Sequence, residues 1–110
     1  MSRKQKKHTM SSLVNTTWKI TATNRDFLTC TVKFLTSGVA TISWSNGVAT
    51  NATWKEGKRF FSFTLNTTYP FDGSEFNFMG THQDGKGNGQ VNIEHDGGSQ
   101  WSPFETVKMS

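Results

Sequence analysis

Cysteine, proline and long apolar runs are scarce in this sequence, and each shortage excludes something. The single cysteine, Cys30, rules out an internal disulfide, and no segment approaches the length of a transmembrane helix. No apolar leader is visible, so we expect a cytoplasmic protein, although a chain already freed of its signal would look the same. With 110 residues, the chain has the length of one domain with one core.

The net positive charge comes from the start of the chain. The formal net charge is +4, but four of the twelve basic residues, Arg3, Lys4, Lys6 and Lys7, lie in the first seven positions. The other eight balance the eight acidic residues. Residues 1–12 lack apolar periodicity and are predicted to be a disordered basic tail before a single domain at 13–110. We expect this tail to be solvated, and any contact with nucleic acid or an anionic membrane to be weak.

What the chain has in quantity is aromatic residues and threonine, which favour β-strands. Only 33% of the residues are hydrophobic, yet 13% are aromatic, including nine Phe and four Trp. Apolar and polar residues alternate between turn signals that recur about every eight to twelve residues. This spacing predicts eight short strands: 15–23, 27–36, 39–45, 48–55, 59–67, 74–83, 90–95 and 100–109.

Tight turns and the absence of a long crossover indicate an all-β, antiparallel up-and-down meander. Pairing the last strand with the first would remove both exposed edges, which favours a closed barrel. Pro103 lies inside the last strand, so we expect it at an edge or a bulge. The second strand alternates most regularly, and Cys30 is predicted to be a small buried side chain on its inner face.

Two hairpins test the predicted register. At Ser45-Asn46-Gly47, a two-residue turn would place Trp44 and Trp54 on opposite faces, whereas a three-residue bulged loop aligns Trp44 with Val48 and Trp54. We favour the bulged loop because burial sets register more strongly than a turn dipeptide does. At residues 84–89, a longer flexible hairpin is predicted, with His82 opposite Val91.

Titratable residues gather near the predicted sixth and seventh strands, but their spacing argues against shared chemistry. The group comprises His82, Asp84, Glu94, His95 and Asp96. In the predicted register the two histidines are offset by four residues, about 13 Å, which is too far for one metal ion. No catalytic triad follows from the spacing. We therefore expect no metal, no cofactor and no catalytic residues, and a protein that is not an enzyme.

Short motifs resemble those of the calycins, the superfamily of lipocalins and avidins. Asn15-Thr16-Thr17-Trp18 resembles their first strand, although Thr17 stands where glycine is usual. The segment 51–57, followed by Phe61, Phe63 and Leu65, is similar to the middle hairpin of small lipocalin-like domains. Phe78-Met79-Gly80 and a last strand that includes Trp101 also fit that layout. The resemblance implies a ligand-binding barrel, but the biotin-binding residues of avidin have no matching set here.

The expected interior is crowded with rings, so any pocket is predicted to be small and close to one rim. The rings predicted to point inward are Trp18, Phe34, Trp44, Trp54, Phe61, Phe63, Phe76 and Phe78. An eight-stranded barrel is only just wide enough for such side chains or for one small ligand. The four tryptophans are predicted to be mainly core residues.

The leading functional expectation is binding of a small, largely apolar ligand at that rim. The predicted contacts are Trp44, Trp54, Tyr69, Phe71 and Trp101, with His82 or His95 as a polar partner. Tyr69 and Phe71 are included because they lie in a loop beside Pro70. The alternative is a filled barrel that acts as a protein-interaction module or a homo-oligomer, with no small-molecule ligand.

Overall fold

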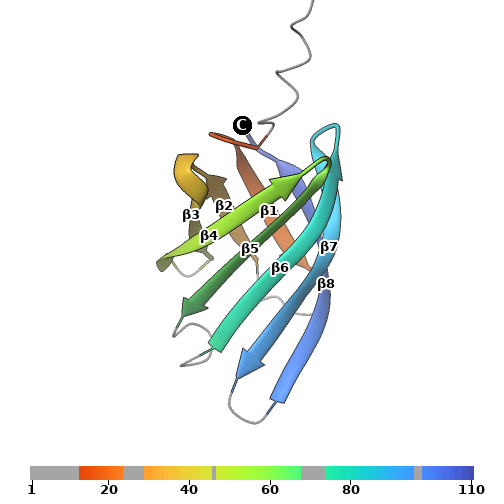
Figure 1. The fold of residues 1–110 in the computed structure, drawn as a ribbon. Coiled ribbons are helices and arrows are strands. Elements are labelled where there is room, and N and C mark those ends of the chain that lie inside the picture. The colour runs from red at the N-terminus through yellow and green to blue at the C-terminus, as the bar shows by residue number, and fades with distance from the viewer. Residues whose placement is uncertain (1–12, 24–28, 46, 68–73, 96–97) are drawn as a thin grey trace, which may run out of the picture.

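The computed structural model describes residues 13–23, 29–45, 47–67, 74–95 and 98–110, and these form a closed antiparallel barrel (Figure 1). Its strands are β1 (Thr17–Ala22), β2 (Cys30–Phe34), β3 (Val39–Trp44), β4 (Ala49–Gly57), β5 (Phe60–Thr67), β6 (Ser74–Gln83), β7 (Lys86–His95) and β8 (Gly98–Lys108). They pair in chain order, and β8 pairs with β1. The predicted meander barrel is confirmed. In these ranges the one helical segment is the short 3-10 turn η3 (Thr36–Gly38), and no helix is long and apolar enough to cross a bilayer.

Alternate residues of every strand point into the barrel and fill it with aromatic rings. Phe63 stacks on Phe78 with ring centroids 4.5 Å apart, and Phe78 continues to Phe104 at 5.7 Å. At one end Trp44 packs edge-on against Phe76 at 5.6 Å. The whole set of buried apolar residues includes nine aromatic side chains: Trp18, Phe34, Trp44, Trp54, Phe61, Phe63, Phe76, Phe78 and Phe104. The lumen is therefore a packed core.

The hairpin between β3 and β4 has the predicted three-residue loop. Trp44 N donates a hydrogen bond to Val48 O at 2.8 Å, and Gly47 has a φ of 92°, a conformation that favours glycine. Trp44 and Trp54 are consequently buried on the same face, as expected. Val48 departs from the predicted inner face, because it lies just before β4 begins and is 42% exposed.

The predicted register of the β6–β7 hairpin is wrong. β6 and β7 are joined by only two residues, Asp84 and Gly85, and both have positive φ. This is the backbone of a type I′ turn, which Asp-Gly suits. His82 therefore lies opposite Gly87, not Val91, and the supposed flexible loop forms the first part of β7.

Glycine is needed in this part of β7 because the backbones approach closely. A Cβ on Gly89 would collide with Met79 O and would lie 2.6 Å from Gly80 Cα. Gly80 is directly opposite Gly89, and a Cβ there would lie 2.6 Å from Asn88 O. The glycines that suggested a loop are thus required by the tight coiling of the sheet.

Pro103 lies where the pairing between β8 and β1 ends, in agreement with the predicted edge position. The paired residues run from Trp18 and Lys108 to Ala22 and Phe104. One step further, Thr23 N donates to Pro103 O at 2.9 Å. Proline has no N–H to return this bond, so the position at the end of the ladder suits it.

The two ends of the barrel differ, and we name them for the rest of the description. The mouth is the end where β1, β3, β5 and β7 begin and where β2, β4, β6 and β8 end; the far end is opposite. The C-terminal residues also lie at the mouth, where Met109 N donates to Thr17 O at 2.7 Å (Figure 1). Leu13, which leads into β1 at the mouth, is fully buried.

The close approach at Gly89 predicts a large effect of a small substitution. Gly89→Ala should lower the free energy of unfolding by about 1–3 kcal/mol, because the added methyl displaces backbone and not a flexible side chain. Gly57→Ala is the control, since its Cβ would meet nothing closer than 3.8 Å. Urea unfolding of both variants measures the difference, and equal midpoints would contradict the described coiling of β6 and β7.

Candidate functional site

Among the described residues, two depressions adjoin at the mouth and share Arg59, His82 and Gln83. The first, the mouth cleft, has a volume of about 520 Å³ and lies between the β4–β5 and β6–β7 turns. Its lining is Trp18, Gly57, Lys58, Arg59, His82, Gln83, Asp84, Gly85 and Lys108. The second, the outer cleft, has about 620 Å³ and runs over β6, β7 and β8 past Thr81, Asn88 and Glu105.

His82 joins the packed core to the mouth cleft. It continues the inward series of β6 beyond Phe76 and Phe78, and the opposite residue, Gly87, has no side chain. Its ring lies 5.6 Å from that of Trp18 and 6.0 Å from that of Phe61. These contacts make the imidazole the last ring of the aromatic column, at the floor of the cleft.

The electrostatics of His82 favour a neutral imidazole. Desolvation lowers the pKa of His82, while the nearby Glu56 carboxylate acts in the opposite direction. Nε2 of His82 is buried and has no hydrogen-bond partner among the described residues. A buried polar atom without a partner costs about 1–3 kcal/mol, so a ligand that hydrogen-bonds to Nε2 would recover that energy.

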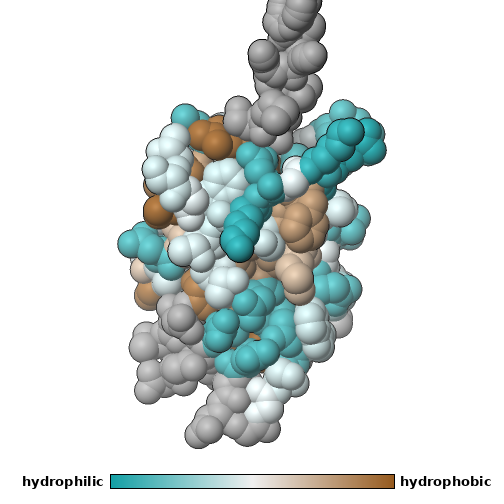
Figure 2. Space-filling model, viewed as in Figure 1, coloured by the Kyte–Doolittle hydropathy of each residue, from teal (hydrophilic) through white to brown (hydrophobic). Residues whose placement is uncertain are grey.

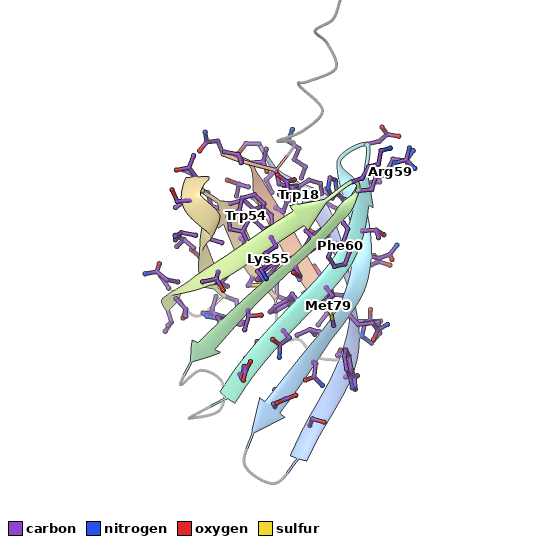
Figure 3. All side chains as sticks on the ribbon, viewed as in Figure 1. Trp18, Trp54, Lys55, Arg59, Phe60 and Met79 are labelled. Atoms are coloured by element: carbon purple, nitrogen blue, oxygen red, sulfur yellow. The ribbon has the colours of Figure 1, made fainter. Side chains whose placement is uncertain are left out.

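Arg59 is held at the edge of the cleft by a strained backbone. It is the second residue of the two-residue loop between β4 and β5, and its φ is 65°. Glycine, asparagine or aspartate usually fill such positions. A backbone hydrogen bond holds the turn in place, since His82 N donates to Arg59 O at 3.0 Å. The guanidinium thus projects at the mouth, beside the β6–β7 hairpin (Figure 3).

The side chains around Arg59 give the cleft an apolar floor and a mainly cationic edge. Trp18 is 4% exposed, and its Nε1 donates to Thr16 Oγ1 at 2.9 Å, so its ring is fixed. Lys58 and Lys108 add two exposed cations, and Asp84 contributes the one carboxylate of the lining. Such a cleft can hold a flat apolar group and an attached anion.

Two of the predicted contact residues are structural. Trp54 Nε1 donates to Leu35 O at 2.9 Å, and its ring packs on Phe34 at 4.9 Å. Trp44 Nε1 donates to Thr50 Oγ1 at 3.3 Å. Both side chains are buried and neither lines a cleft described here.

Of the remaining predicted contacts, the two that the structure describes are not brought together with His82. Trp101 lies near the far end and is 56% exposed, so the prediction that it is a core residue is wrong. His95 ends β7 at the far end, so eight residues, roughly 26 Å of strand, separate it from the partner of His82. Tyr69 and Phe71 lie outside the described residues. Of the predicted contacts that the structure describes, His82 alone lines the mouth cleft.

Metal binding and thiol chemistry find no support among the described residues. In the described ranges, no three His, Cys, Asp or Glu side chains are grouped so as to hold a metal ion. The histidine offset is larger than the four residues predicted, so the argument against a shared metal becomes stronger. Cys30 is buried, and desolvation raises its pKa to about 12, which leaves an unreactive thiol.

Comparisons of the chain with family models, with curated proteins and with solved structures found no match. No match therefore supports membership of the calycins. What the structure shares with them is the eight-stranded meander barrel. The site has to be interpreted from its own geometry.

The strain at Arg59 predicts a substitution that increases stability. Arg59→Gly should raise the free energy of unfolding by about 0.5–1 kcal/mol, because relief of the left-handed conformation exceeds the entropy cost of glycine. Lys58→Gly, at the neighbouring position without a positive φ, should lower it. Urea unfolding compares the two, and a destabilising Arg59→Gly would show that its side chain is mainly structural.

The depressed pKa of His82 predicts a pH dependence with a definite sign. The unfolded chain binds a proton to His82 near the ordinary pKa of about 6.5, whereas the folded protein resists doing so. Stability should therefore be lost as pH falls from about 7 towards the folded pKa of His82. The measurement is unfolding free energy against pH for the wild type and His82→Gln. The variant should lose less stability in this window; parallel curves would refute the assignment.

Proposed function

We propose that this protein is a calycin-like, non-enzymatic binding protein that holds a small amphipathic anion in the mouth cleft. The observation that carries the proposal is the juxtaposition of a ring floor with the unpartnered Nε2 of His82 and the strained, cationic Arg59. The expected ligand was largely apolar. The cationic edge adds an anionic group to that description.

The floor of the cleft supports the apolar part of the ligand. Trp18 and His82 meet edge to face, with an interplanar angle of 67°, and both line the cleft. A flat ring or short apolar group placed against them would extend the aromatic column by one member. Offset or edge-to-face contacts of this kind contribute roughly 0.5–1.5 kcal/mol beyond the burial of area.

The edge of the cleft supports the anionic part. Arg59, Lys58 and Lys108 face one carboxylate, Asp84, in the lining. Arginine binds carboxylates and phosphates through two parallel N–H bonds, and hydrogen bonds to charged groups contribute about 1.5–3 kcal/mol. An arginine with a φ of 65° strains the backbone, and strain of this kind is typical of functional sites.

The packed lumen argues against an internal ligand. Phe34, Phe63 and Phe78 are each at most 2% exposed, and their rings contact one another across the barrel. A ligand inside would have to displace these rings. The cleft above His82 needs no such displacement.

Titration with naphthyl phosphate, followed by calorimetry or tryptophan fluorescence, tests the proposal. Naphthyl phosphate should bind more tightly than neutral naphthol or inorganic phosphate, because each of these lacks one half of the proposed ligand. Arg59→Gly should weaken binding of naphthyl phosphate about tenfold or more while the protein stays folded.

Lys33→Gln is the matched control, since it removes a positive charge near the mouth without altering the cleft lining. It should leave the affinity for naphthyl phosphate within about twofold, as screening weakens interactions with distant exposed charges. Equal binding of naphthol and naphthyl phosphate, or equal losses in Arg59→Gly and Lys33→Gln, would contradict the proposal.

A further inference from the structure

The charges of the barrel are sorted by end, although they balance in number along the sequence. Register places every basic side chain that the structure describes in the half nearer the mouth. These residues are Lys19, Lys33, Lys55, Lys58, Arg59, Lys86 and Lys108. The carboxylates described in the same half are Glu56, Asp84 and Glu105. The mouth half thus has a clear excess of positive charge.

The far end has the opposite sign in the described part of the chain. Glu75 and Glu94 lie directly opposite each other on β6 and β7, one step from the ends of these strands. No described basic residue lies in this half. The barrel therefore has a dipole along its axis, which would turn the mouth towards an anionic surface and the far end away from it.

The basic tail adds to the same end. Leu13 is buried at the mouth, and Asn15 N donates to Phe34 O at 2.7 Å, so the chain enters β1 there. Residues 1–12, with Arg3, Lys4, Lys6 and Lys7, are joined to the barrel at this point.

Exposed apolar side chains surround the mouth between these cations. They come from several strands, and they are Val39 at 40% exposed, Phe60 at 42%, Val107 at 52% and Met109 at 59%. On the face drawn in Figure 2, hydrophobic areas near the mouth alternate with hydrophilic ones. Phe60 lies beside Lys55 on the outer face, with Met79 below it (Figure 3).

We propose that the mouth is a docking surface for an anionic lipid membrane. The cations are distributed around the rim, on β1, β2, β4, β7 and β8, and this distribution fits a plane of headgroups. The apolar side chains between them reach the boundary between headgroups and acyl chains, as in proteins that bind the membrane interface. The proposal goes beyond binding in the cleft. It shares Lys58, Arg59 and Lys108 with the lining of the mouth cleft and adds four lysines that do not line it, Lys19, Lys33, Lys55 and Lys86.

A nucleic acid fits the same charges less well. Proteins that bind single strands track the backbone along a groove and stack bases on aromatic side chains. Of the exposed apolar residues around the mouth, only Phe60 is aromatic, and valine and methionine provide no comparable stacking face. Cations spread over separate strands around the rim also offer no continuous path for a nucleic-acid strand.

Co-sedimentation with phosphatidylcholine vesicles, with and without phosphatidylserine, tests the docking surface. The full chain should partition onto vesicles that contain phosphatidylserine and not onto the neutral ones. Each basic residue near such a surface contributes roughly fivefold to partitioning, equivalent to about 1 kcal/mol. The double variant Lys33→Gln, Lys86→Gln should therefore lower the partition coefficient about 25-fold.

The matched control changes net charge equally at the far end, through Ser99→Glu and Gln100→Glu, two exposed positions of β8. This variant should partition like the wild type. The two double variants should still differ in partition coefficient when the tail cations of the chain are replaced by glutamine. Three results would each overturn the proposal. The partition coefficient could fall equally in both double variants, or it could be unaffected by phosphatidylserine. The protein could also bind a single-stranded oligonucleotide more tightly than vesicles, with the same dependence on the mouth residues.

The two proposals fail separately. Lys33 and Lys86 do not line the mouth cleft, so their replacement leaves naphthyl phosphate binding intact. A protein that binds naphthyl phosphate but ignores anionic vesicles refutes docking alone. A protein that binds vesicles but not naphthyl phosphate refutes the cleft ligand alone.

Discussion

The rest of the structure depends on the mutual packing of aromatic rings inside a barrel just wide enough to hold them. Phe63 and Phe78 stack at 4.5 Å near the middle, and ring contacts extend from there to Trp44 at one end and Trp18 at the other. A filled lumen leaves no interior space of the kind that larger barrels use for ligands. It also makes the barrel rigid, because close-packed rings resist rearrangement. Any binding function is thereby moved to the rim or to the outer surface, and the rim carries the unusual chemistry.

His82 and Arg59 show how that chemistry follows from the packing. The inward alternation of β6 makes position 82 the last ring position, and the glycines at 80, 87 and 89 let β7 coil closely over it. The two-residue turn before β5 then places Arg59 above the same point, joined to His82 through the backbone. A partly desolvated imidazole and a strained cation are consequently next to each other, without a direct bond between their side chains being needed. The axial separation of charge, with cations at the mouth and Glu75 and Glu94 at the far end, places this pair on the end that faces anionic partners.

Much of the fold was predictable from the sequence, and less of the site. The alternation of Cys30, Val32 and Phe34, and the bulged loop that aligns Trp44 with Trp54, follow from burial, which is a strong and local signal. The β6–β7 register was missed because Gly87 and Gly89 resemble loop residues. Their role is explained by the close approach of Thr81 to Gly87 and of Met79 and Gly80 to Gly89. Arg59 and Trp18 were missed as site residues because nothing along the chain links them. Twisting of closed strands brings them to one cleft, whereas Trp44 and Trp101 lie towards the other end. The net charge of +4 equals the charge of Arg3, Lys4, Lys6 and Lys7, but a count of charges along the sequence cannot reveal how the remaining charges are sorted by end.

The most direct test of this account is where a bound molecule lies. Intermolecular NOEs from naphthyl phosphate to the protein, measured by isotope-filtered NMR, answer this without any substitution. The account predicts contacts from the naphthyl protons to the rings of Trp18 and His82, and none to the rings at the centre of the barrel. NOEs to Phe63, Phe78 or Trp44 would show that the lumen opens to admit a ligand, and would contradict the claim that the packed core confines binding to the mouth.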